Sequence, residues 1–126
     1  MTRVSRALAG VFFGICILGA SAPAGHAAGA MAIGTCAAYG YAFDYRNADA
    51  ARVAAQGKCR GADCKVVVTL RRSCAAFAID GHRPCGPHGF ASARRLGQAE
   101  NVALKSCYRY GGRDCVIRAF ACDVKG

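Results

Sequence analysis

Hydrophobic and polar positions alternate most clearly between Tyr39 and Tyr45. Aromatic residues occupy every second position of this segment, and small or acidic residues lie between them. A two-residue period is typical of a strand with two different faces. We expect the helices of the domain to cover the aromatic face, although such a row could instead be a stacking platform for bases or sugars.

An Ala-rich segment after Asn47 predicts the first helix. Asn47 is a favourable N-cap, Asp49 lies in the first turn, and the helical pattern ends on Cys59. A short turn leads to Cys64. The run from Cys64 to Leu70 is almost continuously apolar, which predicts a strand that is covered on both faces.

The same succession of helix, turn and strand recurs later in the chain. A second helix is expected over about residues 98–108, with Val102, Ala103 and Leu104 on its apolar face. The apolar run 116–121 then predicts the last strand of the domain.

Two shorter strands are predicted at 74–79 and 90–92. They flank the segment 80–89, which is rich in glycine and proline and is expected to join the two halves of the domain. In contrast, residues 28–35 are small and lack a pattern, so we expect them to form a frayed start.

The cysteines also divide into two sets of four, one in each half of the domain, with similar spacing. We therefore expect a small α+β domain of two pseudo-symmetric strand-helix-strand repeats, at about 36–80 and 85–122, packed on a mainly antiparallel sheet. A ferredoxin-like order is one candidate topology. Each crossover would then place its helix on one face of that sheet.

The start of the chain indicates export. Arg3 and Arg6 precede an apolar run and small residues, which predicts a signal peptide at 1–28 with cleavage between 24 and 28. The rest, 29–126, is long enough for one small domain. We expect no transmembrane segment after signal removal, and a secreted or periplasmic location.

The chain has 126 residues and nine cysteines, of which eight remain after signal removal. In a short exported chain an even number of cysteines predicts a disulfide framework. The eight are Cys36, Cys59, Cys64, Cys74, Cys85, Cys107, Cys115 and Cys122.

The two short spacings suggest the pairs Cys59 with Cys64 and Cys107 with Cys115, each joining a helix end to the next strand. A strand between Cys64 and Cys74 would hold these two too far apart for a bridge. The remaining four could pair within each half, as Cys36 with Cys74 and Cys85 with Cys122, or across the halves. We favour pairing within each half.

Several of these segments together resemble a known family. They are Tyr39-Gly40-Tyr41, the Ala-rich helix ending on Cys59, the strand 63–68, the segment 73–79, and the second helix with its strand from Cys115. In this combination the chain resembles the DUF4189 family of exported bacterial proteins from about 38 to 122. The resemblance implies export, an α+β fold and structural cysteines, and it implies no catalytic residues.

The chain also departs from the family pattern. Cys36 and Cys85 look like additions, and the segment 82–88 replaces a plainer turn. Set against the family, these additions make a bridge between Cys36 and Cys85 an alternative to pairing within each half.

The segment from His82 to His88 contains the densest group of metal-binding residue types. His82, Cys85 and His88 could bind a soft metal if the thiol of Cys85 were free. An oxidising compartment would instead take Cys85 into a disulfide. A metal-binding or thiol-dependent protein that uses these three residues is therefore the alternative function, and we expect no metal or other cofactor.

The formal net charge is +10, and removal of Arg3 and Arg6 with the signal peptide leaves +8. No Cys-x-x-Cys pair, nucleophile elbow or phosphate loop is present in the sequence. We therefore expect a non-enzymatic binding domain whose basic surface takes an anionic polymer or acidic protein in the envelope or outside the cell. The residues expected to bind it are Arg71, Arg72, Arg94, Arg95 and Arg118.

Overall fold

Six strands and two helices make up the part of the chain that the computed structural model describes, residues 27–124. Except for its last two residues, the predicted signal peptide lies outside this range. The elements in chain order are β1 (Ala28–Ile33), β2 (Tyr39–Tyr45), α1 (Ala48–Lys58), β3 (Lys65–Leu70), β4 (Ser73–Asp80), β5 (His88–Ala93), α2 (Leu96–Arg109) and β6 (Cys115–Asp123). The predicted α+β class is confirmed.

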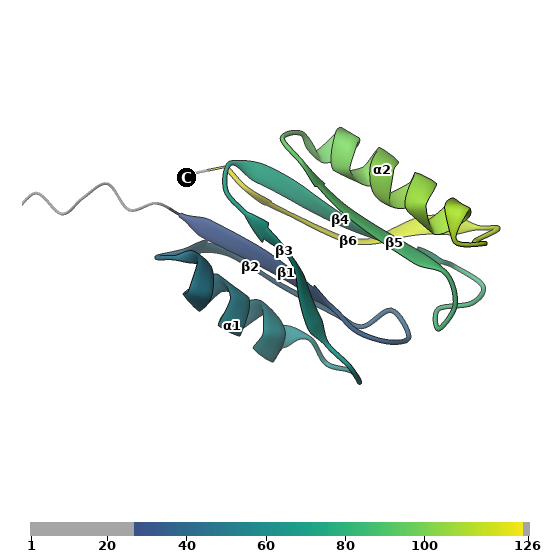
Figure 1. The fold of residues 1–126 in the computed structure, drawn as a ribbon, viewed down its shortest axis with the longest axis horizontal. Coiled ribbons are helices and arrows are strands. Elements are labelled where there is room, and N and C mark those ends of the chain that lie inside the picture. The colour runs from purple at the N-terminus through teal and green to yellow at the C-terminus, as the bar shows by residue number, and fades with distance from the viewer. Residues whose placement is uncertain (1–26, 125–126) are drawn as a thin grey trace, which may run out of the picture.

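The strands form two antiparallel sheets of three strands each. The first sheet has the order β2-β1-β3, and the second has the order β5-β4-β6. Figure 1 shows α1 on the outer face of the first sheet and α2 on the outer face of the second, with the inner faces packed together. The strands therefore form two sheets in place of the one expected, and the candidate ferredoxin-like order is not the one observed.

The predicted frayed start is instead the central strand of the first sheet. β1 is buried along its whole length and pairs with both β2 and β3. Ala30 and Ala32 face α1, whereas Met31 and Ile33 point into the core between the sheets. Because alanine and glycine give a weak hydrophobic signal, this alternation is hard to recognise in the sequence.

Most of the aromatic row of β2 lies away from the helices, contrary to expectation; of its four rings only Tyr45 packs on the side of α1. Gly40 and Ala42 are the residues buried against α1, and Tyr39 and Tyr41 pack against the edge of the core between the sheets. The small residues face the helix because its backbone lies directly over β2. Aromatic side chains would not fit into that space.

The strand β3 is also more exposed than expected. It is an edge strand of the first sheet, and Leu70 is its only fully buried residue, whereas Val66, Val67 and Val68 are partly buried. A nearly continuous apolar run indicates burial on both faces when a strand is central. Here β1 takes the central place.

Both helices begin and end close to the predicted residues. In α1 the Asn47 side chain accepts a hydrogen bond from the backbone N–H of Ala50, at 2.8 Å, which confirms the predicted N-cap. The buried residues of α2 are Ala99, Ala103 and Cys107. Val102, predicted to lie on the apolar face, is 52% exposed, because the buried positions follow a spacing of four residues that excludes it.

The two sheets divide the chain at a different place from the expected joint. Residues 28–70 form the first sheet and its helix, and residues 73–123 form the second, so the crossing lies at Arg71 and Arg72. The segment 81–87 connects β4 to β5 within the second sheet. Each part has the order strand, strand, helix, strand.

All eight cysteines of the described chain form disulfides. Cys59 with Cys64 and Cys107 with Cys115 pair as predicted. The favoured pairing of the other four within each half is wrong, because the bridges are Cys36–Cys85 and Cys74–Cys122. Cys74 and Cys122 face each other in the register of β4 and β6. Cys36–Cys85 joins the β1–β2 loop to the β4–β5 loop, the alternative that the departure from the family pattern suggested.

Candidate functional site

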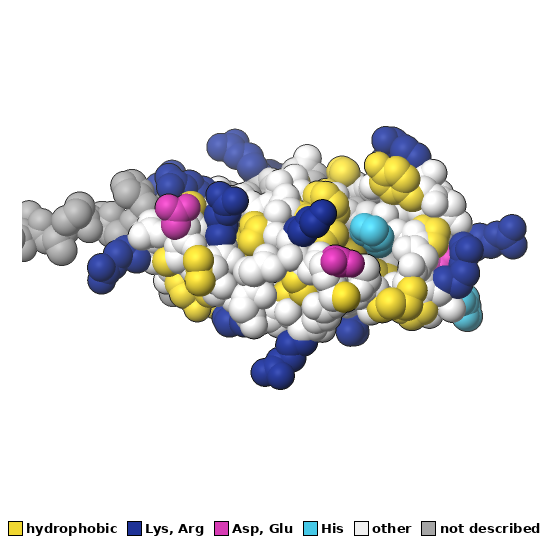
Figure 2. All heavy atoms as spheres, turned by 60° about the horizontal axis from the view of Figure 1, so that its bottom comes forward, with side chains coloured by type: hydrophobic (Ala, Val, Ile, Leu, Met, Phe, Trp, Pro, Cys, Tyr) yellow, Lys and Arg dark blue, Asp and Glu magenta, His cyan; other side chains and the backbone are white. Residues whose placement is uncertain are grey.

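Four of the five predicted anion-binding arginines lie at one end of the molecule. Arg71 and Arg72 form the turn into β4, and Arg94 and Arg95 follow β5. Because Cys74 pairs with Ala93, the turn before β4 and the turn after β5 are neighbours at the same end of the second sheet. We call these four exposed residues the arginine end. Figure 2 shows Lys and Arg side chains at this end, where β1 begins, and others over the rest of the same face.

The start of α2 lies next to the arginine end. Arg95 is the N-cap residue, its side chain makes no capping hydrogen bond, and the first turn contains no acidic residue. By contrast, Asn47 caps α1 and Asp49 lies in its first turn. The first N–H groups of a helix attract anions, and basic residues oppose the helix dipole there. This start of α2 is therefore suited to an anion that both the arginines and the helix can bind.

The fifth predicted residue, Arg118, lies apart from the other four. It is the extra residue of a bulge in β6, because the register with β4 passes from Ala119 to Ile117. Its Nε donates a hydrogen bond to the carbonyl oxygen of Ala37 at 3.3 Å, and its guanidinium lies 5.2 Å from the centre of the Tyr39 ring. Arg118 therefore belongs to a second surface, near β2.

This second surface is a groove of about 590 Å³ beside β2. We call it the aromatic groove. Its aromatic and charged lining residues are Tyr39, Tyr41, Phe43, Lys58, Arg60 and Arg118. Lys58 and Arg60 were not predicted from the sequence. Their positions on either side of Cys59, at the end of α1, could have indicated a pair of neighbouring cations.

The residues of the predicted metal site do not come together. Cys85 is bonded to Cys36 and has no free thiol. His82 is 81% exposed, and its Nε2 lies 2.7 Å from Oδ2 of Asp114. His88 packs edge-on against Phe77. Within residues 27–124 no three His, Cys, Asp or Glu side chains form a group that could hold a metal ion.

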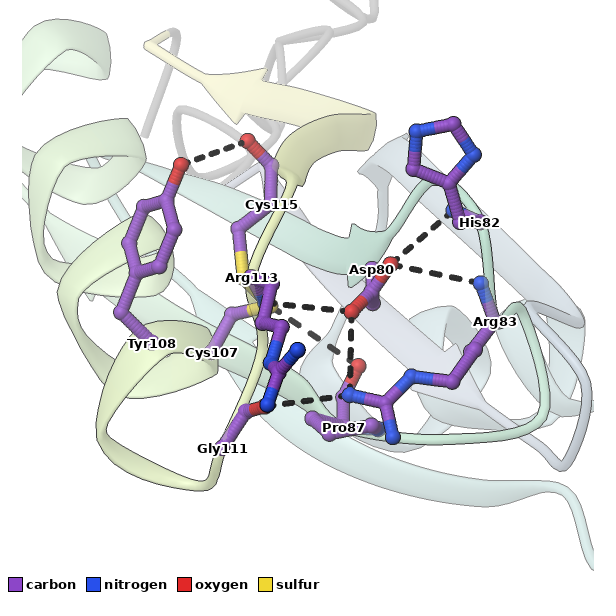
Figure 3. Close-up of a disulfide and its surroundings, with 9 residues drawn as sticks. All are labelled: Asp80, His82, Arg83, Pro87, Cys107, Tyr108, Gly111, Arg113 and Cys115. Carbon is purple, nitrogen blue, oxygen red and sulfur yellow. Dashed lines mark hydrogen bonds and ion pairs between the residues drawn. A yellow bond between two sulfur atoms is a disulfide. The ribbon is translucent and has the colours of Figure 1, made fainter.

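Asp80 forms a polar network that the sequence patterns did not predict. Figure 3 shows its buried carboxylate between the β4–β5 loop and the loop after α2. Oδ1 accepts hydrogen bonds from the backbone N–H groups of His82 and Arg83, at 2.9 and 3.3 Å. Oδ2 accepts one from the backbone N–H of Arg113 at 3.1 Å and one from Nη2 of Arg83 at 3.3 Å. The same Nη2 donates to the carbonyl oxygen of Gly111.

These hydrogen bonds change the acidity of Asp80. The backbone N–H groups of Arg113 and then of His82 stabilise the charged carboxylate and lower the pKa of Asp80 to about 2, although burial alone would raise it. The side chain therefore acts as a charged structural link between two loops. The Asp-Gly pair after a predicted strand is a turn signal that could have pointed to it.

The fold and its disulfides define a small cysteine-bridged α+β domain. A family model described as a domain of unknown function, DUF4189, matches residues 28–122. The chain therefore belongs to the DUF4189 family, as its sequence features suggested. No match was found among the curated proteins or the solved structures. In the part of the chain that the structure describes, no helix is long and apolar enough to cross a membrane.

Proposed function

We propose that this protein is a non-enzymatic binding domain for an anionic partner. The observation that carries the proposal is the arginine end, where two arginine pairs meet beside the uncapped start of α2. Phosphate and carboxylate groups are the anions that arginine and helix N–H groups bind together. The partner class is an anionic polymer or the acidic surface of a protein.

Export is part of the same proposal. Four disulfides fit an oxidising compartment, and the first 28 residues have the sequence pattern of a signal peptide. The partner would then be in the envelope or outside the cell. N-terminal sequencing of the exported protein should give a start just after a residue between 24 and 28.

Binding of inorganic polyphosphate tests the arginine end. The double variant Arg94→Gln/Arg95→Gln should weaken binding at low salt and reduce the slope of log K against log salt by about 1 for each phosphate that is no longer bound. The matched control is Arg109→Gln/Arg113→Gln. It removes the same charge at the far end of α2 and in the loop after it.

The comparison of the two double variants distinguishes a specific anion site from a general effect of net charge. Equal weakening by the two double variants would mean that net charge alone attracts the polymer. No binding at low salt, or binding that is insensitive to salt, would contradict the proposal itself.

A further inference from the structure

The aromatic groove has a shape and chemistry different from those of the arginine end. The rings of Tyr39 and Tyr41 are parallel within 1°, with their centres 6.2 Å apart, and Tyr41 and Phe43 have the same spacing at 18°. Phe43 is 50% exposed although it continues the row. Tyr39 and Tyr41 are half-buried against the core, so the row of three regularly spaced rings is most open to solvent at Phe43.

Positive charge surrounds this row of rings. Lys58, Arg60 and Arg118 line the groove, and none of its lining residues in the described chain carries a carboxylate or a carboxamide. A neighbouring hollow shares Tyr39, Tyr41 and Arg118 and contains one acid, Glu100. The groove thus combines aromatic rings with cations and has a net positive charge.

Two polar contacts hold the groove in shape. At one end of β2 the Arg118 side chain binds the carbonyl oxygen of Ala37. At the other end the backbone N–H of Asp44 donates to Oδ2 of Asp123, at 3.0 Å. These contacts join β2 and the loop before it to β6 across about 80 residues of sequence. A ligand would therefore meet a surface that is already ordered, which lowers the entropic cost of binding.

We propose that the aromatic groove binds single-stranded nucleic acid. Unpaired bases can stack on exposed aromatic rings, and phosphates can pair with the surrounding cations. In a duplex the base faces are covered, so only the phosphates could bind. A sugar chain would need partners for its many hydroxyl groups, and the groove offers no carboxylate or carboxamide for them.

This inference rests on the proposed binding function, because it names a class of anionic polymer. It concerns other residues, however, so the two can fail separately. The arginine end would contact phosphates whether or not bases are attached. The aromatic groove should distinguish a strand with bases from the same backbone without them.

Fluorescence anisotropy with a labelled oligothymidylate and an abasic strand of the same length tests this difference. Phe43→Leu keeps the apolar volume but removes the ring, and it should weaken oligothymidylate binding about five-fold or more, the lower range for one stacked base. Binding of the abasic strand should stay unchanged. The matched control is Phe90→Leu, at a ring that is 40% exposed on β5, outside the groove.

Three further measurements complete the test. Arg118→Gln should also weaken oligothymidylate binding more than Arg109→Gln does, because only Arg118 lies in the groove. Arg94→Gln/Arg95→Gln should weaken binding of both strands alike. Unfolding midpoints of all variants establish that each is folded.

Three outcomes would overturn the inference while leaving the anion-binding function intact. The first is equal binding of oligothymidylate and the abasic strand by the unchanged protein. The second is an equal effect of Phe43→Leu and Phe90→Leu. The third is tighter binding of the polyuronate alginate with loss of that binding in Phe43→Leu, which would assign the groove to acidic sugars.

Discussion

Gly40 in β2 and Gly89 in β5 make the same close contact with the helix that follows each strand. A Cβ atom at Gly40 would overlap the carbonyl oxygen of Ala55, and one at Gly89 would overlap that of Ala103. In each case the next obstacle is the backbone nitrogen of a bridged cysteine at the helix end. Each helix therefore lies directly on its sheet, and the disulfide secures the end of that helix.

Gly40→Ala and Gly89→Ala should each destabilise the domain by about 1–3 kcal/mol, because the added methyl group forces the helix away from the strand. Urea unfolding measures the effect. Gly57→Ala and Gly97→Ala are the controls, since a Cβ at either position meets no atom within 4 Å. They should leave stability unchanged or raise it by up to about 1 kcal/mol. If all four variants changed the stability equally, the helices could move away from the strands without loss of stability, which would contradict this prediction.

Local patterns in the sequence predicted most elements of this fold. Asn47 indicated the start of α1, and the alternation from Tyr39 to Tyr45 indicated β2. Residues 28–33 were missed because a strand of small residues can be central when a helix backbone lies close above it. The division into two sheets depends on pairings between distant strands, which local patterns do not contain.

Local sequence patterns also do not show which residues of the candidate sites lie together in the fold. Each arginine pair was visible in the sequence, but the placement of the two pairs at the same end of the second sheet depends on the register of β4 and β5. Arg118 was grouped with them from charge alone. Its position in β6, opposite Phe77 and Ala78, separates it from them, and its side chain lies beside Tyr39. The register of the sheets therefore decides which cations act together.

Asp80 should make stability depend on acid pH. Its pKa is lowered from 3.8 to about 2 in the folded protein, so the folded state favours the charged form. The resulting stabilisation is complete above about pH 4 and is lost as the pH falls toward 2. Asp80→Asn should thus be less stable than the unchanged protein at pH 6, and this difference should shrink between pH 4 and pH 2. Urea unfolding at several pH values measures it.

Asp114→Asn is the control for this pH dependence. Asp114 is 57% exposed and pairs with the exposed His82, so its removal should change the acid limb of the stability curve much less. A difference between Asp80→Asn and the unchanged protein that stays constant from pH 6 to pH 2 would mean that packing rather than charge explains the effect.

The Cys36–Cys85 bridge should be the first disulfide to be reduced. Both of its cysteines are exposed, whereas each of the other three bridges contains at least one buried cysteine. A reducing thiolate must reach a sulfur atom to attack it, so access favours this bridge. Brief treatment with dithiothreitol followed by alkylation and peptide mapping should label Cys36 and Cys85 before the other six. Earlier labelling of Cys59 and Cys64 would contradict this order.

The same bridge should stabilise the domain without being required for its fold. Cys36–Cys85 and Cys74–Cys122 close segments with separations of 49 and 48 residues, so the second bridge still restrains the unfolded chain when the first is absent. Cys36→Ser/Cys85→Ser should therefore remain folded and lose about 2–4 kcal/mol, measured by urea unfolding. Because the variant keeps the contacts of Arg118 and Asp123 that hold the groove, it should keep its affinity for oligothymidylate. A parallel loss of affinity and stability would show that the two loops, and not the contacts along β2, maintain the groove.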